Sequence, residues 1–209
     1  MAYIVKTPWW LRKLYGNFIW KMPPGDELAV YLTFDDGPHP TATPFVLDQL
    51  KKYHATATFF CIGKNVVQHP DIYKRTLNEG HTTGNHTYNH VNGWHTKTAG
   101  YYKNVRKAAA HIKSNLFRPP YGRIKRSQAN ILFRSNPDLH IYMWDVLSGD
   151  FDTELTAEAC LDNVLNNLEP GSIVVFHDSD KAWPRMSYAL PKVLEYCAGK
   201  NWAVRALPQ

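Results

Sequence analysis

Short apolar runs and longer amphipathic runs alternate along most of this 209-residue chain. The apolar runs are short and rich in β-branched or aromatic residues, which is typical of buried strands. Strands are predicted at 28–34, 56–62, 139–146, 173–176 and 202–206, with weaker ones ending near Gly84 and Phe117. Helices are predicted at 43–53, 66–79, 98–114, 127–134, 157–168 and 185–197. A strand–helix alternation repeated six or seven times predicts an α/β fold with a mainly parallel sheet.

Polar side chains follow five successive predicted strands. They are Asp35 and Asp36, His86 and His90, Arg118, the segment 145–150, and His177 with Asp178. An open sheet would spread these residues along a crevice, whereas a closed sheet brings the carboxyl ends of all its strands to one face. We therefore predict an irregular, TIM-like (β/α) barrel with seven strands.

The chain is long enough for one domain with one core. We predict a catalytic domain at 28–209 and an N-terminal aromatic and basic extension at 1–27 packed on it. The alternative for residues 1–21 is an amphipathic helix that makes peripheral contact with a membrane surface. No transmembrane segment is predicted because no apolar stretch approaches about 20 residues. No secretory signal is visible. A cytoplasmic or membrane-peripheral protein fits this observation, and so does a protein whose leader has been removed.

Charge and cysteine content limit the partners further. The net charge is +6, but the Lys and Arg residues are scattered, so we predict a mildly basic surface and no nucleic-acid partner. Cys61, Cys160 and Cys197 are widely spaced and odd in number, which indicates reduced, buried thiols.

His86 and His90 are four residues apart. On a helical turn both rings would lie on one face and could bind one metal ion. Ten histidines in 209 residues make such a spacing common by chance, so the pair alone is weak evidence.

Asp35 and Asp36 strengthen the case for a metal site. Two adjacent carboxylates at the end of an apolar strand cannot both be buried without a large desolvation cost. The simpler alternative is a turn, because Asp-Asp-Gly-Pro is favourable turn sequence. Combined with both histidines, however, one carboxylate completes a three-ligand site with open positions, typical of a catalytic metal centre. The N/O ligands favour one divalent ion, with Zn²⁺ first and Co²⁺, Ni²⁺ or Mn²⁺ as alternatives.

Five segments, in order, resemble the polysaccharide deacetylases, that is, the NodB-homology domain of carbohydrate esterase family four. The matching segments are 33–37 (Thr-Phe-Asp-Asp-Gly), 86–90 (His-Thr-Tyr-Asn-His), 118–122 (Arg-Pro-Pro-Tyr-Gly), 144–151 and 175–177 (Val-Phe-His). The resemblance extends from about residue 30 to residue 206. It implies that Asp36, His86 and His90 bind the metal, that Asp35 is the general base, and that Arg118 holds Asp35 in place.

The resemblance also implies roles around the leaving group. His177 would be the general acid and Asp150 would orient it, while Tyr121, Trp144 and Phe176 would lie at the oxyanion and substrate site. Three positions depart from the family pattern, with Leu147 in place of an aspartate, Phe151 in place of a tryptophan and Phe176 in place of a leucine. We expect Phe151 and Phe176 to reshape the acetyl pocket.

The predicted function is therefore metal-dependent hydrolysis of N-acetyl groups on a carbohydrate substrate, with an N-acetylglucosamine-containing glycan favoured and acetate released. O-deacetylation would use the same groups. The alternative from another class is a catalytically silent barrel that binds glycan or metal. A base at Asp35 and an acid at His177 argue against it, because binding requires neither.

Overall fold

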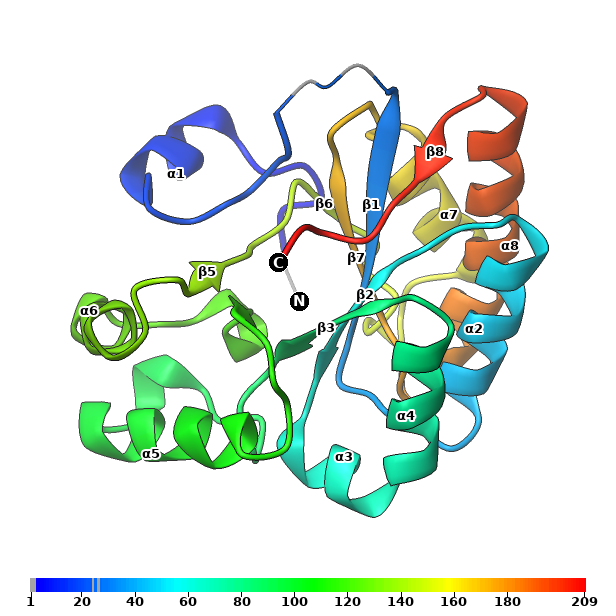
Figure 1. The fold of residues 1–209 in the computed structure, drawn as a ribbon. Coiled ribbons are helices and arrows are strands. Elements are labelled where there is room, and N and C mark those ends of the chain that lie inside the picture. Colours follow the sequence, from blue (N-terminus) through cyan, green and yellow to red (C-terminus); the bar gives the residue numbers. More distant parts are fainter. Residues whose placement is uncertain (1–2, 24, 26) are drawn as a thin grey trace.

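The computed structural model describes residues 3–23, 25 and 27–209. Within them the strands form one curled sheet in the order β5-β4-β3-β2-β1-β7-β6, and β8 pairs with β1 (Figure 1). Each of these strand pairs is parallel. The helices lie around the outside of the curled sheet, with α2, α4, α7 and α8 at the right and α5 and α6 at the left of Figure 1. The predicted irregular (β/α) barrel is confirmed.

The elements of the sheet follow the predicted strands closely at most positions. The strands are β1 (Ala29–Asp35), β2 (Thr58–Cys61), β3 (Thr82–Asn85), β4 (Leu116–Phe117), β5 (His140–Ile141), β6 (Val146–Leu147), β7 (Ile173–His177) and β8 (Ala203–Val204). The helices are α1 (Trp9–Leu14), α2 (Ala42–Lys52), α3 (Gly63–Gln68), α4 (Pro70–Asn78), α5 (Thr98–Ala109), α6 (Arg126–Ser135), α7 (Ala157–Leu165) and α8 (Trp183–Gly199), with 3-10 turns η1 (Gly93–His95) and η2 (Pro120–Gly122).

Two predicted elements are each split in two. The helix predicted at 66–79 is two helices, because Pro70 starts α4 and the residue before a proline disfavours the helical conformation. The strand predicted at 139–146 is also wrong. Its ends are β5 and β6, which lie at opposite edges of the sheet and pair with β4 and β7. The barrel is therefore open between them.

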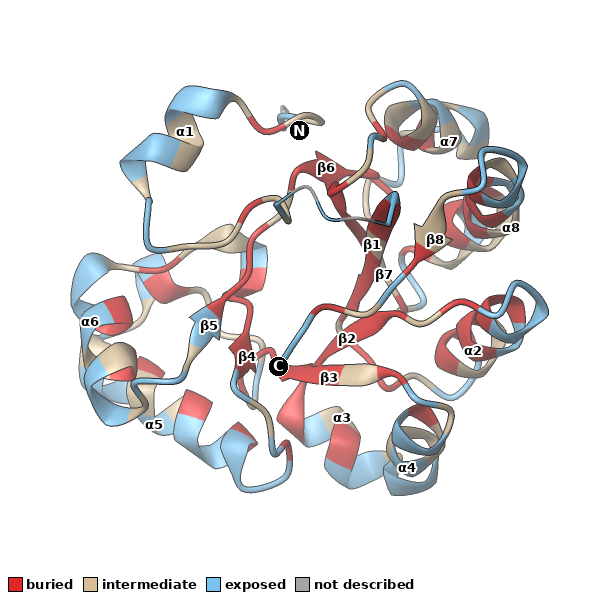
Figure 2. Ribbon diagram, turned by 45° about the horizontal axis from the view of Figure 1, so that its top comes forward, coloured by how far each residue is buried: buried red, intermediate tan, exposed pale blue. Residues whose placement is uncertain are grey.

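The central strand β1 separates two chemically different faces. Phe34 faces the helices and stacks between Phe59 and Phe176, with ring centroids 5.1 and 6.0 Å away. Asp35 points to the opposite, interior side, and its partner in the β1–β7 register is His177. Figure 2 shows buried residues concentrated along the strands and on the inward sides of the helices. The apolar layer outside the barrel thus supports a polar interior at the carboxyl ends of the strands.

The N-terminal segment lies across the opening between β5 and β6. It makes isolated bridges from Ile19 to Tyr142, from Lys6 to Val146 and from Lys21 to Ser172. Trp20 is buried in a cluster with residues of α5 and α6. The described part of the predicted extension therefore packs against the barrel, while residues 1–2, 24 and 26 lie outside the described residues.

Asp145 does not join the polar group at the carboxyl ends of the strands, as its position after a predicted strand had indicated. It precedes β6 and is fully buried, and its carboxylate accepts hydrogen bonds from Lys6 and Ser172, both at 2.7 Å, and from Arg12. The physical reason is the break in the predicted strand: β6 begins at Val146, so Asp145 lies at the amino end of this strand and not at its carboxyl end. Asp150, not Asp145, therefore reaches the candidate active site.

All three cysteines are free and buried, as predicted. A search of the described residues finds no helix with the length and apolar character needed to cross a bilayer.

Candidate active site

The structure brings Asp36, His86 and His90 together at the carboxyl ends of β1 and β3. One ligand atom from each lies within 4.8 Å of the others. Asp36 Oδ1 is 3.2 Å from His90 Nε2 and 3.9 Å from His86 Nε2. Asp36 Oδ1 is also buried and makes no hydrogen bond to any described residue. A carboxylate oxygen facing two imidazole nitrogens is the donor set of a divalent metal site with open positions.

The two histidines do not lie on a helical turn, so that part of the prediction is wrong. Residues 86–90 form a loop in which Thr87 and His90 have φ values of 63° and 54°. The Asn85 side chain stabilises this loop by accepting a hydrogen bond from the Thr87 backbone N–H at 2.8 Å. The loop still places the two rings 5.1 Å apart. Tertiary geometry, not helical periodicity, brings the rings together.

Both histidines are electrically suited to bind a cation. Burial lowers the pKa of His86 to about 4 and also lowers the pKa of His90, so both are neutral imidazoles at physiological pH. His86 Nδ1 lies 2.7 Å from the Arg118 carbonyl oxygen, which leaves Nε2 facing the Asp36 carboxylate. A second-shell carbonyl of this kind fixes the tautomer of a ligating histidine. The residues present therefore fit a divalent metal ion.

Asp35 is held as an anion by a buried guanidinium. Arg118 is fully buried and donates to Asp35 Oδ1 at 2.7 Å and to Thr33 Oγ1 at 2.6 Å. The carbonyls of Tyr142 and Met143 accept its remaining hydrogen bonds, at 3.2 and 2.8 Å. Burial by itself would raise the pKa of Asp35, but the nearby charge of Arg118, with His86 and His177, holds it below its usual value. Asp35 is thus ionised beside the metal-binding residues.

Asp178 is a site residue whose part the sequence did not reveal. Its buried carboxylate accepts a hydrogen bond from the Gly37 backbone N–H at 2.9 Å and another from the Thr43 hydroxyl. A side chain at Gly37 would place its Cβ 2.1 Å from Asp178 Oδ2. The backbone of Asp36 has a φ of 86° in the turn that this carboxylate supports. Asp178 therefore positions Asp36. In the sequence, the position of Asp178 next to His177 was the feature that could have indicated this role.

His177 and Asp150 form a tight pair. His177 Nδ1 lies 2.7 Å from Asp150 Oδ1, and the His177 backbone N–H donates to Asp150 Oδ2, also at 2.7 Å. Burial by itself would lower the pKa of His177, but the charge and hydrogen bond of Asp150, together with Asp36 and Asp35, raise it to about 10. His177 therefore carries a proton at neutral pH, with Nε2 left free of this pair.

This pairing predicts a change in pH dependence for Asp150→Asn. Asp150 raises the pKa of His177, so its neutral replacement is expected to lower that pKa and to bring the alkaline limb of the pH–rate profile to lower pH. The measurement is kcat/KM across the pH range for both proteins. Asp162→Asn, an exposed change on α7, is the control. An alkaline limb at the same pH in wild type and Asp150→Asn would show that Asp150 does not set the pKa of the group that acts as the acid.

The residues predicted at the substrate site are divided between two regions. The Tyr121 side chain is exposed, and its ring centroid lies 4.6 Å from that of His90. The Tyr121 backbone has a φ of 60°. The Trp144 ring packs so closely on Gly122 that a Cβ there would lie 2.6 Å from it. Phe151 lies edge-on to the His177 ring, 5.4 Å away. Tyr121 and Phe151 thus each lie beside the ring of a site histidine, and Trp144 lies beside the turn that carries Tyr121.

Phe176 does not line this site, and its predicted effect on an acetyl pocket is wrong. It is fully buried in the helix-facing layer against Phe34. Adjacent strand residues point to opposite faces, so Phe176 must face away from the interior if His177 faces into it. The phenylalanine that replaces the family's leucine at this position therefore changes the packing of the core and not the substrate site.

Comparison with known proteins agrees with this geometry. The sequence model of the polysaccharide deacetylase family matches residues 23–134. A peptidoglycan-N-acetylglucosamine deacetylase of Bacillus cereus is 36% identical over 97% of this chain and 74% of its own length. A chitooligosaccharide deacetylase of Azorhizobium caulinodans is 33% identical over 73% of this chain and 75% of its own. The crystal structure of the Bc1960 peptidoglycan N-acetylglucosamine deacetylase, bound to a hydroxamate-type benzamide, superposes with a TM-score of 0.83 at 30% identity, over 95% and 94% of the two chains.

These matches define the class first: the chain has the fold of the metal-dependent carbohydrate deacetylases, and Asp36, His86 and His90 could hold the metal. The chain belongs to the polysaccharide deacetylase family, also called carbohydrate esterase family four. The predicted family and enzyme class are therefore confirmed.

Proposed function

We propose that this protein hydrolyses the N-acetyl group of an N-acetylglucosamine-containing glycan and releases acetate. The observation that carries the proposal is the convergence of three groups at one end of the barrel. They are the Asp36–His86–His90 donor set, an ionised Asp35 held by Arg118, and a protonated His177 held by Asp150. Such a set supplies a metal site, a base and an acid, which amide hydrolysis requires together.

The chain's own residues divide the reaction between them. Asp35 takes a proton from the attacking water as the water oxygen bonds to the acetyl carbon. His177 delivers its proton to the amine nitrogen as the carbon–nitrogen bond breaks, which leaves acetate and a free amine. The backbone N–H of Tyr121 would donate a hydrogen bond to the developing oxyanion. A divalent ion held by Asp36, His86 and His90 supplies the Lewis acid that acidifies the water and polarises the carbonyl, and we propose Zn²⁺ for it.

Arg118 and Asp150 act as positioning residues. Arg118 keeps the Asp35 carboxylate ionised and fixed, since four acceptors hold its guanidinium in the barrel interior. Asp150 fixes His177 through two hydrogen bonds, one from the ring Nδ1–H and one from the backbone N–H. The substrates in the relatives' names, peptidoglycan N-acetylglucosamine and chitooligosaccharide, support an N-acetylated glycan as the substrate.

A survey of acetate release tests this function. Metal-loaded protein is incubated with chitooligosaccharides, peptidoglycan fragments and acetylated xylan, and acetate is quantified. We expect release from the first two, and Asp35→Asn serves as the control for contaminating activity. Release from acetylated xylan only would make the enzyme an O-deacetylase. No release from any of the three would favour the silent barrel.

A further inference from the structure

The helix α1 lies at the end of the barrel opposite the candidate active site. Arg12 on α1 pairs with Asp145, which precedes β6, and Lys6 pairs with both Asp145 and Glu169, at 2.7 and 2.9 Å. Glu169 in turn precedes β7, and Lys21 pairs with it at 2.8 Å. These anchors all lie at the amino ends of the strands, whereas the metal-site, base and acid residues lie at the carboxyl ends. Figure 1 shows α1 set apart from the helices that cover the sheet.

One side of α1 faces the protein. Leu11 and Tyr15 pack against the buried cluster that contains Trp20, and Arg12 reaches the buried Asp145. At 100° per residue, positions 11, 12 and 15 fall within one arc of the helix. This arc attaches the helix to the barrel.

The other arc of α1 carries Trp9, Trp10, Lys13 and Leu14, which we call the α1 surface. Trp9, Trp10 and Leu14 are 68%, 53% and 56% exposed, and the Lys13 ammonium lies 5.0 Å from the centre of the Trp9 ring. No residue of α1 is buried. Large apolar side chains gathered at the surface, with their helix fixed by ion pairs on the other side, mark an interaction site.

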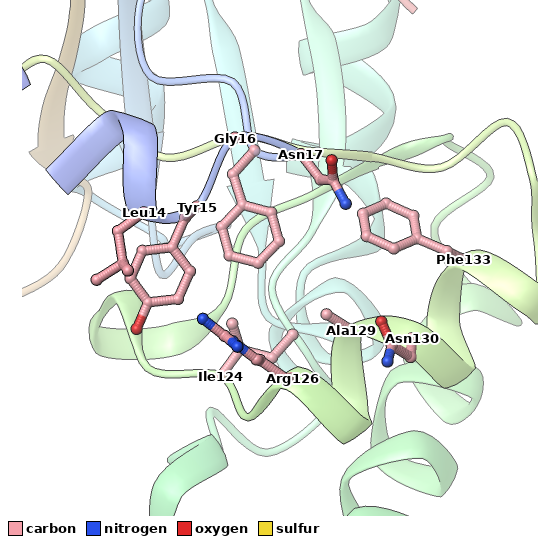
Figure 3. A pocket seen from close by; sticks show the side chains of 10 residues that line it. Leu14, Tyr15, Gly16, Asn17, Ile124, Arg126, Ala129, Asn130 and Phe133 are labelled. Atoms are coloured by element: carbon pink, nitrogen blue, oxygen red, sulfur yellow. The ribbon is translucent and has the colours of Figure 1, made fainter. Parts of the chain in front are cut away.

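Cations outnumber acidic residues around this surface, although Lys6, Arg12 and Lys21 pair with Asp145 or Glu169 and leave Lys13 as the remaining cation of residues 1–21. Residues 1–21 contain four Lys and Arg residues and no Asp or Glu. Residues 116–137 also contain Lys and Arg residues and no Asp or Glu. A cavity of about 320 Å³ separates the end of α1 from α6 and is lined by Leu14, Tyr15, Phe18, Phe133 and Arg126, among others (Figure 3). Aromatic and cationic side chains therefore continue from α1 onto α6.

We propose that the α1 surface docks on an anionic phospholipid bilayer. Tryptophan rings settle at the membrane–water interface, and Lys and Arg side chains beside them are attracted to anionic headgroups. A stable protein interface usually involves about 20–30 residues a side, whereas interfacial membrane binding needs only a few anchors such as these four side chains. Docking at this end leaves the candidate active site facing away from the bilayer. This inference does not rest on the proposed function.

Vesicle co-sedimentation tests the proposal with the full chain. We expect binding to vesicles of phosphatidylglycerol and phosphatidylcholine, weaker binding to phosphatidylcholine alone, and release by salt. The double variant Trp9→Ser/Trp10→Ser should lower the partition coefficient by roughly tenfold or more, and Lys13→Gln by roughly fivefold. The matched control is Trp94→Ser, since Trp94 is also 53% exposed but lies on η1, in the segment that follows the metal-site loop. The control should bind like wild type.

None of these side chains is buried, so the variants are expected to fold. Circular dichroism and thermal unfolding check that they do. Unchanged vesicle binding by the double variant would overturn the proposal, as would equal binding to neutral and anionic vesicles. Absence of wild-type binding to anionic vesicles would do the same. A wild-type dimer that becomes monomeric in the double variant, measured by light scattering, would assign the surface to a second copy instead.

Discussion

Asp35→Asn is expected to lower the rate of deacetylation by about 10³-fold while metal binding stays stoichiometric. The amide cannot accept the proton of the attacking water, yet its oxygen can still accept the hydrogen bond that Arg118 donates at 2.7 Å. The three metal-binding residues are untouched. The measurements are acetate release at saturating substrate and metal content per chain.

The control for this change is Asp48→Asn, because the Asp48 side chain is 60% exposed and lies on α2, outside the site. Wild-type turnover in Asp35→Asn would remove Asp35 as the base. Loss of metal together with activity would instead make Asp35 part of the metal site. That outcome is a real alternative, since Asp35 Oδ2 lies 3.9 Å from His86 Nε2.

His86→Ala is expected to abolish stoichiometric metal binding and, with it, turnover. The change removes one of three ligands, so affinity should fall by more than the roughly 10- to 100-fold that loss of an outer-shell partner causes. His86 is 2% exposed, and a cavity at this position could also destabilise the fold. Asp36→Ala, at a less buried position, therefore provides the second measurement. Metal content after dialysis and isothermal titration with Zn²⁺ report the effect directly.

His140→Ala is the matched histidine control, since His140 is exposed and lies on β5, away from the ligand set. The ligand assignment is wrong if either His86→Ala or Asp36→Ala keeps one tightly bound metal per chain. Restored turnover at high metal concentration would support the assignment, because it would show that the base and acid remain in place.

Several features of the fold and site were predictable from sequence because they are local. The apolar runs of strands and the spacing of polar residues after them placed Asp35, Arg118 and His177 at one end of a parallel barrel, and parallel topology brings such ends together. Phe176 could also have been placed correctly. Its neighbour His177 was assigned to the interior, and alternation along a strand then sends Phe176 to the helix-facing core.

Other features depend on contacts between distant segments. The break between β5 and β6 was invisible in the apolar run 139–146, because the N-terminal segment supplies the backbone partners at the opening, at Ile19 and Lys6. The role of Asp178 depends on the Gly37 turn, 141 residues away along the chain.

The alternating pattern on which the prediction began therefore determined by itself the class of fold and the end of the barrel that carries the chemistry, whereas the roles of individual residues were implied by the resemblance to the deacetylase family. Only the tertiary structure decided how the 86–90 loop joins two histidines to Asp36, and which side of α1 is buried and which is exposed. The physical reason is that hydrophobic periodicity indicates the secondary structure of a segment and which of its faces is buried in the core. It does not encode which remote carboxylate, carbonyl or guanidinium completes a buried polar group.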